Sequence, residues 1–366
     1  MGIIPAQYYQ IIYLIIVGVL TIVCGLSYSS KRTIDITKRN NNLDFVVFFY
    51  FLLVFFIGLR PISGQYFADM SSYAAYYYAA QSGSPLNNME ADWLFQAFMG
   101  ACARSVDVTV FFLLCEVIYL VPIYIASRRI AWNNTTLVLL FFLGAFSTFS
   151  YGTNGIRNGL ACSLVILAAT YLNSNTRDKI ICALLCFLAI GFHKSTFLPV
   201  SAMVFSYFYK KPKTMFYFWV SSIFISLAAG NSIADFFSAL GFDDRMEQYI
   251  HLEGDVLDQF SKVGFRWDFL LYSTMPIIMG WYAVFKRKII DLNYLILLGT
   301  YIYSNAFWIM VIRAPYSNRF AYLSWFIYPI VLCYPMLKFD LWRNQGGKVA
   351  LILLGQFVFT LFMFLR

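Results

Sequence analysis

Long apolar runs separated by short polar segments dominate this chain. About twelve of the runs are long enough, or nearly long enough, to cross a bilayer as an α-helix, which takes about 20 residues. The runs have approximate limits 8–27, 44–59, 107–127, 134–151, 156–173, 179–192, 195–209, 214–230, 267–285, 292–312, 319–337 and 349–365. The pattern predicts an all-α, polytopic membrane protein of about twelve transmembrane helices, forming a single integral membrane domain over residues 1–366.

Two polar connections are longer than the rest. The first covers 60–106 and contains the short amphipathic stretch 92–104, which predicts an interfacial or re-entrant helix. The second covers 231–266, is acidic and has no apolar span. We expect both connections to be loops on the same side of the membrane.

Composition supports the membrane class. Apolar residues make up 60% of the chain and charged residues 12%, whereas soluble domains carry about a quarter charged residues. No basic segment precedes the first apolar run, so we expect a retained span and not a cleaved signal peptide. The seven cysteines all lie in apolar stretches and there are two histidines, so we expect no disulfide framework, metal site or cofactor.

The placement of basic residues predicts the orientation. Lysine and arginine follow every second span, and the positive-inside rule places these connections in the cytoplasm. Both termini and both long loops then face the periplasm across a bacterial inner membrane. The basic residues concerned are Lys31, Arg32, Lys38, Arg39, Arg128, Arg129, Arg177, Lys179, Lys210, Lys211, Lys213, Lys286, Arg287, Lys288, Lys338, Arg343 and Lys348. The net charge of +9 therefore reflects topology, and we expect no nucleic-acid partner.

Other cations lie on the side that the rule disfavours. Those at the outer mouths of spans two, five, six, ten and eleven are Arg60, Arg157, Lys194 (beside His193), Arg313 and Arg319. A single arginine at such a position often only reaches toward lipid phosphate, and this interpretation suffices for Arg313, Arg104 and Arg366. A cluster of such cations predicts a cationic pocket that binds a pyrophosphate. Guanidinium groups bind phosphate through two parallel hydrogen bonds, and they can neutralise the charge of a departing pyrophosphate.

Three acids, Asp69, Glu90 and Asp92, lie in the same outer loop as Arg60. A carboxylate there can take the proton from a sugar hydroxyl that attacks a glycosyl carbon. The alternative is that these acids only pair with the arginines. Glu116 lies inside the third span, where a carboxylate is costly in lipid, so we expect it to face the helix bundle.

Several short motifs follow one another on this outer side: Gly58-Leu59-Arg60-Pro61, Asp69-x-x-x-Tyr73, Glu90-x-x-x-Leu94, Gly155-Ile156-Arg157-Asn158-Gly159-Leu160-Ala161, Gly191-Phe192-His193-Lys194-Ser195 and Asn318-Arg319-Phe320 with Tyr322. Their order over residues 50–330 resembles the EpsG-type branch of the Wzy family of O-antigen and exopolysaccharide polymerases. That family often has Gly-x-Asp-Tyr in its first loop, whereas Gly64 and Asp69 are further apart here, so Glu90 is the alternative to Asp69.

The resemblance implies a GT-C-like membrane glycosyltransferase that joins oligosaccharide repeat units carried on undecaprenyl pyrophosphate, without metal or nucleotide sugar. Its partners would be these lipid-linked oligosaccharides, membrane lipid and a separate chain-length regulator. Mapped onto this chain, Arg60, Arg157 and Arg319 would hold the pyrophosphate, with Lys194 as a weaker ligand. His193 would donate a hydrogen bond to the pyrophosphate or to the bridging oxygen. Asp69 or Glu90 would be the general base.

Three other functions compete with this one. A flippase or exporter of lipid-linked oligosaccharide would also have about twelve helices and a cationic cavity, although the chain shows no repeated halves. An O-antigen ligase would share the donor and differ only in the acceptor. A multi-span sugar acyltransferase is the weakest alternative, because the first 190 residues contain no histidine.

We expect Arg157→Ala and Arg319→Ala to abolish polymer formation while membrane insertion stays normal, because each removes a guanidinium assigned to the pyrophosphate. Gel analysis of the polymer, set against the amount of protein in the membrane fraction, measures both effects. Polymer of normal length and amount from Arg157→Ala would contradict the assignment.

Overall fold

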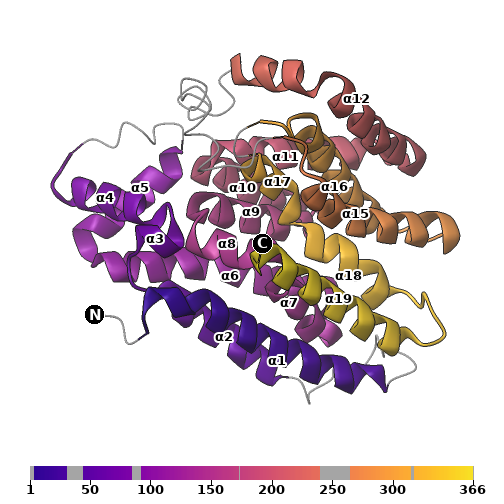
Figure 1. Cartoon of the computed structure of the whole chain (residues 1–366), viewed down its shortest axis with the longest axis horizontal. Coiled ribbons are helices and arrows are strands. Elements are labelled where there is room, and N and C mark those ends of the chain that lie inside the picture. Colours follow the sequence, from indigo (N-terminus) through magenta and orange to yellow (C-terminus); the bar gives the residue numbers. More distant parts are fainter. Residues whose placement is uncertain are drawn as a thin grey trace. The chain divides into compact units, whose positions relative to one another are not determined.

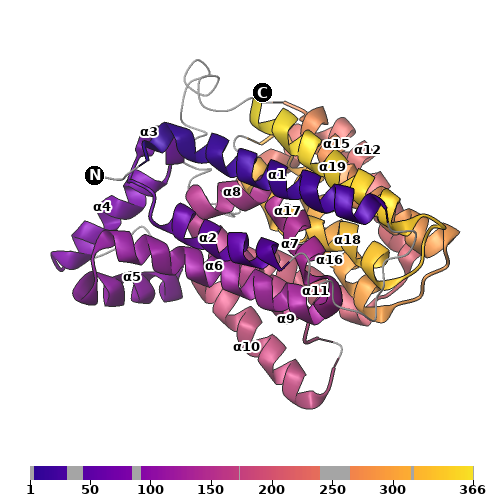
Figure 2. The same cartoon turned by 90° about the horizontal axis from the view of Figure 1, so that it is seen from below.

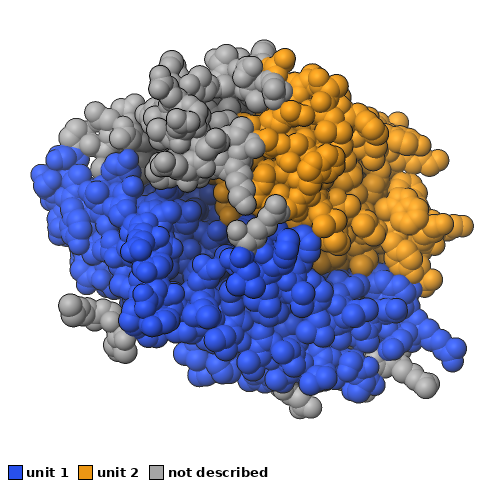
Figure 3. All heavy atoms as spheres, in the orientation of Figure 1, with its two compact units in different colours: residues 1–196, 333–366 blue, residues 197–332 orange. Residues whose placement is uncertain are grey.

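The computed structural model describes residues 4–30, 44–84, 92–172, 174–239, 264–314 and 317–365. Helix accounts for 83% of the structure, and these ranges contain no strand, so the all-α prediction is confirmed. The chain divides into two compact units, each described here by itself (Figure 3). Unit 1 comprises 1–196 and 333–366, and unit 2 comprises 197–332.

Every predicted apolar run coincides with one helix or with two consecutive helices. The helices of unit 1 are η1 (Ala6–Tyr8), α1 (Tyr9–Ser29), α2 (Phe45–Gly58), α3 (Gly64–Phe67), α4 (Met70–Gln81), α5 (Trp93–Ser105), α6 (Val108–Ala131), η4 (Trp132–Asn134), α7 (Thr135–Leu143), α8 (Phe146–Thr153), α9 (Ile156–Ala169), α10 (Thr176–Phe192), η5 (Lys194–Thr196) and α19 (Gln345–Leu365), of which α3, α4 and α5 lie within the predicted loop 60–106. Unit 2 has α11 (Phe197–Phe208), α12 (Pro212–Ala239), α15 (Trp267–Trp281), the π-helical turn η6 (Tyr282–Lys286), α16 (Leu292–Met310) and α17 (Asn318–Trp325). The boundary between the units falls within α18 (Tyr328–Lys338).

Four described segments are long and apolar enough to cross a membrane: Ala6–Ser29, Val108–Leu143, Asn318–Lys338 and Gln345–Leu365. Phe45–Gly58 and Ile156–Ala169 are shorter apolar helices. These helices are typical of a membrane protein, whereas the number of about twelve spans and the GT-C-like architecture stay predictions. Of the second predicted loop, residues 231–239 continue α12 as helix after a kink at Ala229, and 240–263 lie outside the described residues.

The helices of unit 1 bring several predicted outer segments to one end. Helices α2, α6, α9 and α10 pack in successive pairs, and α1 packs along α19 (Figures 1 and 2). The start of α1, the end of α2 and the start of α6 lie at the end of the unit where α3, α4 and α5 are found. Because α5 also packs against α10, the residue that precedes α5 comes close to the residues that follow α10.

The predicted run 134–151 is broken into two helices, α7 and α8. The backbone of Ala145 is extended between them, which leaves carbonyl groups without their helical partners. Side chains satisfy the carbonyls of residues 141 to 144: Gln356 Nε2 donates to Phe141, Thr148 Oγ1 to Phe142, Tyr13 Oη to Leu143 and Thr360 Oγ1 to Gly144, over 2.5 to 2.8 Å. A helix break within an apolar environment requires such partners, because lipid offers none.

Unit 2 has a buried polar network of its own. The Asn305 amide accepts from Trp219 Nε1 at 2.8 Å and donates to Ser273 Oγ and Ser324 Oγ at 3.1 and 3.0 Å. Trp325 Nε1 also donates to Ser273 Oγ, at 2.8 Å. Such satisfied groups hold α12, α15, α16 and α17 in a defined register.

We expect Tyr13→Phe to lower the stability of the purified protein by about 1–3 kcal/mol, because the Leu143 carbonyl at the break loses its donor while it remains buried. Thermal unfolding in detergent measures this change. Tyr8→Phe is the matched control, since Tyr8 is 48% exposed and should unfold at the wild-type temperature. Equal unfolding temperatures for all three proteins would mean that the break does not depend on Tyr13.

Candidate functional site

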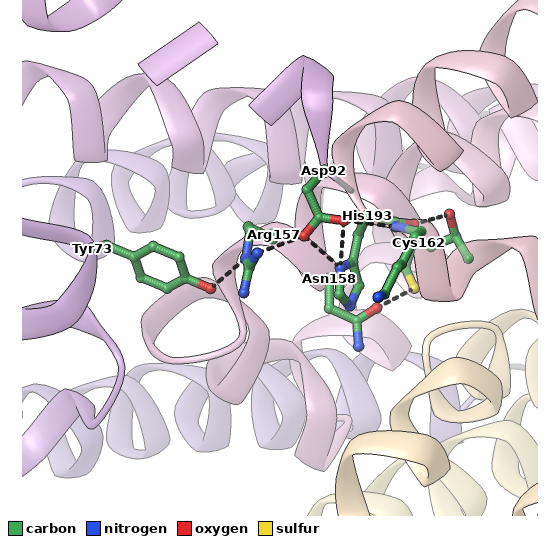
Figure 4. A network of polar contacts seen from close by, with 8 residues as sticks. Tyr73, Asp92, Arg157, Asn158, Cys162 and His193 are labelled. Carbon is green, nitrogen blue, oxygen red and sulfur yellow. Dashed lines mark hydrogen bonds and ion pairs between the residues drawn. The ribbon is translucent and has the colours of Figure 1, made fainter. Parts of the chain in front are cut away.

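Asp92 is the centre of a polar network in unit 1 (Figure 4). Its Oδ2 lies 2.5 Å from Arg157 Nη1 and 3.1 Å from His193 Nδ1. Its Oδ1 accepts the backbone N–H of Lys194 at 2.9 Å and lies 3.3 Å from His193 Nδ1. One carboxylate therefore joins the start of α5, the first turn of α9 and the segment that follows α10.

Local structure explains why Asp92 points into this network. An aspartate directly before a helix usually caps the first turn, but the Asp92 side chain makes no hydrogen bond to its own helix. The close packing of α5 on α10 requires Gly191, because a Cβ there would lie 2.8 Å from Trp93 Cζ2 and 3.0 Å from Leu94 Cβ. The backbone is extended at His193, where α10 ends, and this turns the ring and the next N–H group toward Asp92.

Arg157 is the second residue of α9, where a cation is normally unfavourable because the helix N-terminus is already positive. The Asp92 carboxylate compensates for that charge. Arg157 Nε also donates to Tyr73 Oη at 3.2 Å, and Tyr73 is anchored by an edge-to-face contact with Phe95. No side chain caps the start of α9. The backbone N–H groups of its first turn and the Arg157 guanidinium are therefore donors in the same part of the helix.

The network is buried but not closed. The side chains of Asp92, Arg157 and His193 are 5%, 12% and 21% exposed. Burial raises the pKa of Asp92, but the hydrogen bond and electrostatic interaction with His193, the charge of Arg157 and the Lys194 N–H together hold it below its ordinary value. Asp92 is therefore ionised at neutral pH. Removing one partner of such a buried ion pair typically costs about 3–5 kcal/mol.

Arg60 is placed differently from an arginine in an open pocket. It is 2% exposed, its Nη1 donates to the Ile57 carbonyl at 2.7 Å and its Nη2 to the Thr153 carbonyl at 3.1 Å. Burial lowers the pKa of Arg60 to about 10, so the guanidinium stays charged at neutral pH. These bonds tie the end of α2 to the end of α8, three residues before Ile156 begins α9. Its assignment to the pyrophosphate stays a prediction.

Asp69 lies near the same turn and is half-buried. Its N–H donates to Asn154 Oδ1 at 3.0 Å, and its carboxylate interacts electrostatically with Arg157. Ala68 adopts a positive φ of 37°, which non-glycine residues rarely do, and this sharp turn presents Asp69 to Asn154.

The other predicted site residues have separate outcomes. Glu90 lies outside the described residues. Lys194 contributes its backbone N–H to Asp92, and its side chain is half-buried. Arg319 is the second residue of α17 in unit 2, so its relation to Arg157 stays a prediction. No group of three or more His, Cys, Asp or Glu side chains within the described ranges is arranged to hold a metal ion.

The structure thus brings together Arg157, His193 and Lys194, and it adds Asp92 and Tyr73 as their partners. The sequence grouped Asp92 with the outer acids, as a candidate base or as a partner of the arginines, and the structure pairs it with Arg157. The signal for its position was that it begins the amphipathic stretch 92–104, but an aspartate there is equally typical of a helix cap.

Comparisons with known proteins agree with the resemblance drawn from the motifs. A family model described as the EpsG family matches residues 44–366, which is most of the chain. No curated protein and no solved structure matches it.

We expect Gly191→Ala to destabilise the protein by about 1–3 kcal/mol, because the added methyl group would push α5 away from α10 and loosen the contact between Asp92 and His193. Thermal unfolding in detergent measures the loss. Gly100→Ala in α5 is the control: its Cβ meets no atom within 4 Å, so the variant should be as stable as wild type or slightly more so. Equal stability of both variants would contradict the close packing at Gly191.

Proposed function

Because the chain belongs to the EpsG family, we propose that it is a polysaccharide polymerase that joins repeat units carried on undecaprenyl pyrophosphate at the outer face of the bacterial inner membrane. Membership in the family suggests polymerase-type glycosyl transfer in polysaccharide biosynthesis. The observation that carries the finer proposal is the convergence of Arg157, from the first turn of α9, with His193 and the Lys194 N–H, from the end of α10, on one carboxylate.

The first turn of α9 has the chemistry to bind a phosphate group. Uncapped N–H groups at a helix N-terminus attract anions, and Arg157 adds a charged, planar donor beside them. Helix α10 offers a contrast, because Asn175 caps it and Asp178 supplies a negative charge in its first turn. In unit 2, Arg319 occupies the same second position of α17, whose start is also uncapped by a side chain.

In the proposed reaction, the hydroxyl of an incoming repeat unit attacks the anomeric carbon of the growing chain. The bond from this carbon to the pyrophosphate oxygen breaks, and the lipid pyrophosphate leaves with the bonding electrons. Arg157, Arg319 and the Lys194 ammonium would stabilise the negative charge that develops on it. The hydroxyl proton must pass to a base, and Asp69 and Glu90 are the carboxylates that the sequence predicts for this step.

The partners follow from this chemistry. The substrates are lipid-linked oligosaccharides, one as donor and one as acceptor, and the site faces the periplasm. No covalent cofactor chemistry is needed, because the activated pyrophosphate bond supplies the driving force. A separate chain-length regulator would control how many units are joined.

The proposal is tested in cells from which the gene has been deleted. We expect them to accumulate single repeat units on the carrier lipid, and the wild-type gene to restore a polymer ladder. Arg157→Lys keeps the charge but loses the planar fork, so it should lower polymer yield by about 10- to 100-fold. Arg177→Lys is the matched control, because Arg177 is the second residue of α10 but is exposed and lies on the predicted cytoplasmic side.

The competing functions give different products in the same cells. Long polymer left on the carrier lipid would indicate a ligase. Repeat units trapped on the cytoplasmic leaflet would indicate a flippase. Either result would overturn the polymerase proposal.

A further inference from the structure

The Asp92 carboxylate is fully engaged by its neighbours. Both oxygens are hydrogen-bonded, to Arg157 and His193 on one side and to the Lys194 N–H on the other, and the side chain is 5% exposed. An acceptor that already serves these donors is a poor base for a substrate hydroxyl. Its position instead affects where the neighbouring side chains carry their hydrogens.

The group most affected is the His193 ring. Its Nδ1 lies 3.1 and 3.3 Å from the two oxygens of Asp92, so a neutral ring donates its hydrogen there and keeps a lone pair on Nε2. His193 is also the most exposed of the network's three ionisable partners, at 21%. Within the described residues, no hydrogen bond occupies Nε2. In this tautomer the ring therefore keeps a proton acceptor, Nε2, that its bonds to Asp92 do not occupy.

Resting on the proposed function, we propose that Asp92 is a positioning residue that fixes this tautomer of His193, and that His193 Nε2, rather than Asp69 or Glu90, takes the proton from the attacking sugar hydroxyl. The oxygen–hydrogen bond breaks as the new bond from oxygen to the anomeric carbon forms. The proton moves to Nε2, and the electrons of the broken glycosyl bond leave with the lipid pyrophosphate. The resulting imidazolium is stabilised by Asp92 and later releases its proton to water.

Chemistry favours the imidazole over the carboxylates. Near neutral pH imidazole is a stronger base than a carboxylate, and general bases work best when their proton affinity matches the working pH. The Asp69 carboxylate, by contrast, interacts electrostatically with Arg157. Arg157 and His193 share one carboxylate, so the base lies next to the group that would hold the leaving pyrophosphate.

The tautomer can be observed without any substrate. The chain has only two histidines, so ¹⁵N-histidine labelling of the full-length protein in nanodiscs gives signals from two rings, and His193→Gln identifies which belong to His193. We expect the neutral His193 ring to carry its hydrogen on Nδ1 in the wild type, and Asp92→Asn to shift the population toward the Nε2–H form. Asp178→Asn is the matched control: it removes a carboxylate paired with Arg129 at the other end of α10 and should leave the His193 signals unchanged.

The opposite tautomer in the wild type, or an unchanged tautomer in Asp92→Asn, would overturn the positioning role. The wild-type spectrum alone can contradict the positioning role. The inference therefore remains testable even if the Asp92→Asn protein fails to fold. This measurement also stands apart from the proposed function, since it requires no glycosyl transfer.

The base role is tested with purified wild-type protein and lipid-linked repeat units extracted from the deletion cells. We expect His193→Ala to lower kcat by about 10²- to 10⁴-fold, and added imidazole to restore part of the rate, which a purely structural role would not allow. Asp92→Asn should lower kcat at least about tenfold with little change in KM, and Asp92→Glu should recover part of the loss. Full activity in His193→Ala would overturn the assignment. So would a result in which Asp69→Asn is inactive while His193→Ala is active. Absence of polymer from the wild type would instead count against the proposed function.

Discussion

Asp92 brings a negative charge to a point where a guanidinium from α9 converges with an imidazole and a backbone N–H from the end of α10. Arg157 would be unfavourable there without it, since this residue opens a helix whose N-terminus is already positive. The carboxylate therefore links the residue before α5 to the first turn of α9 and to the segment after α10. In our proposal it also sets which ring nitrogen of His193 carries the hydrogen. The close packing of α5 on α10 at Gly191 is what brings Asp92 to these groups.

The placement of charge in this chain follows the low tolerance of apolar surroundings for unpaired polar groups. Arg60 is almost completely buried, yet its Nη atoms bond to carbonyls at the ends of α2 and α8, where backbone acceptors lack helical partners. The bond to Thr153 holds the segment that leads into α9, and so the position of Arg157 depends on it. A cation that the sequence predicts for substrate binding thus organises the backbone between α8 and α9.

Most of the helical structure could be predicted from the sequence, because long apolar runs in a chain with few charges have few alternatives to helix. The break between α7 and α8 could not, since its donors Tyr13, Gln356 and Thr360 are 130, 215 and 216 residues away. The same limit applies to the site. Sidedness identified Arg157 and His193, but the partner that joins them is 65 residues from one and 101 from the other, and sidedness alone does not separate a buried guanidinium such as Arg60 from an open one.

The break between α7 and α8 also has a consequence for the order in which the protein matures. Two of its four carbonyls receive their donors from α19, which the ribosome makes roughly two hundred residues later. Until then the nascent segment must keep a continuous helix or find other donors, such as water in the insertion machinery. The carbonyls at the break between α7 and α8 therefore receive their last donors only after translation has passed residue 360. Helix α1, whose Tyr13 already bonds to the Leu143 carbonyl, gains α19 as its packing partner at the same stage.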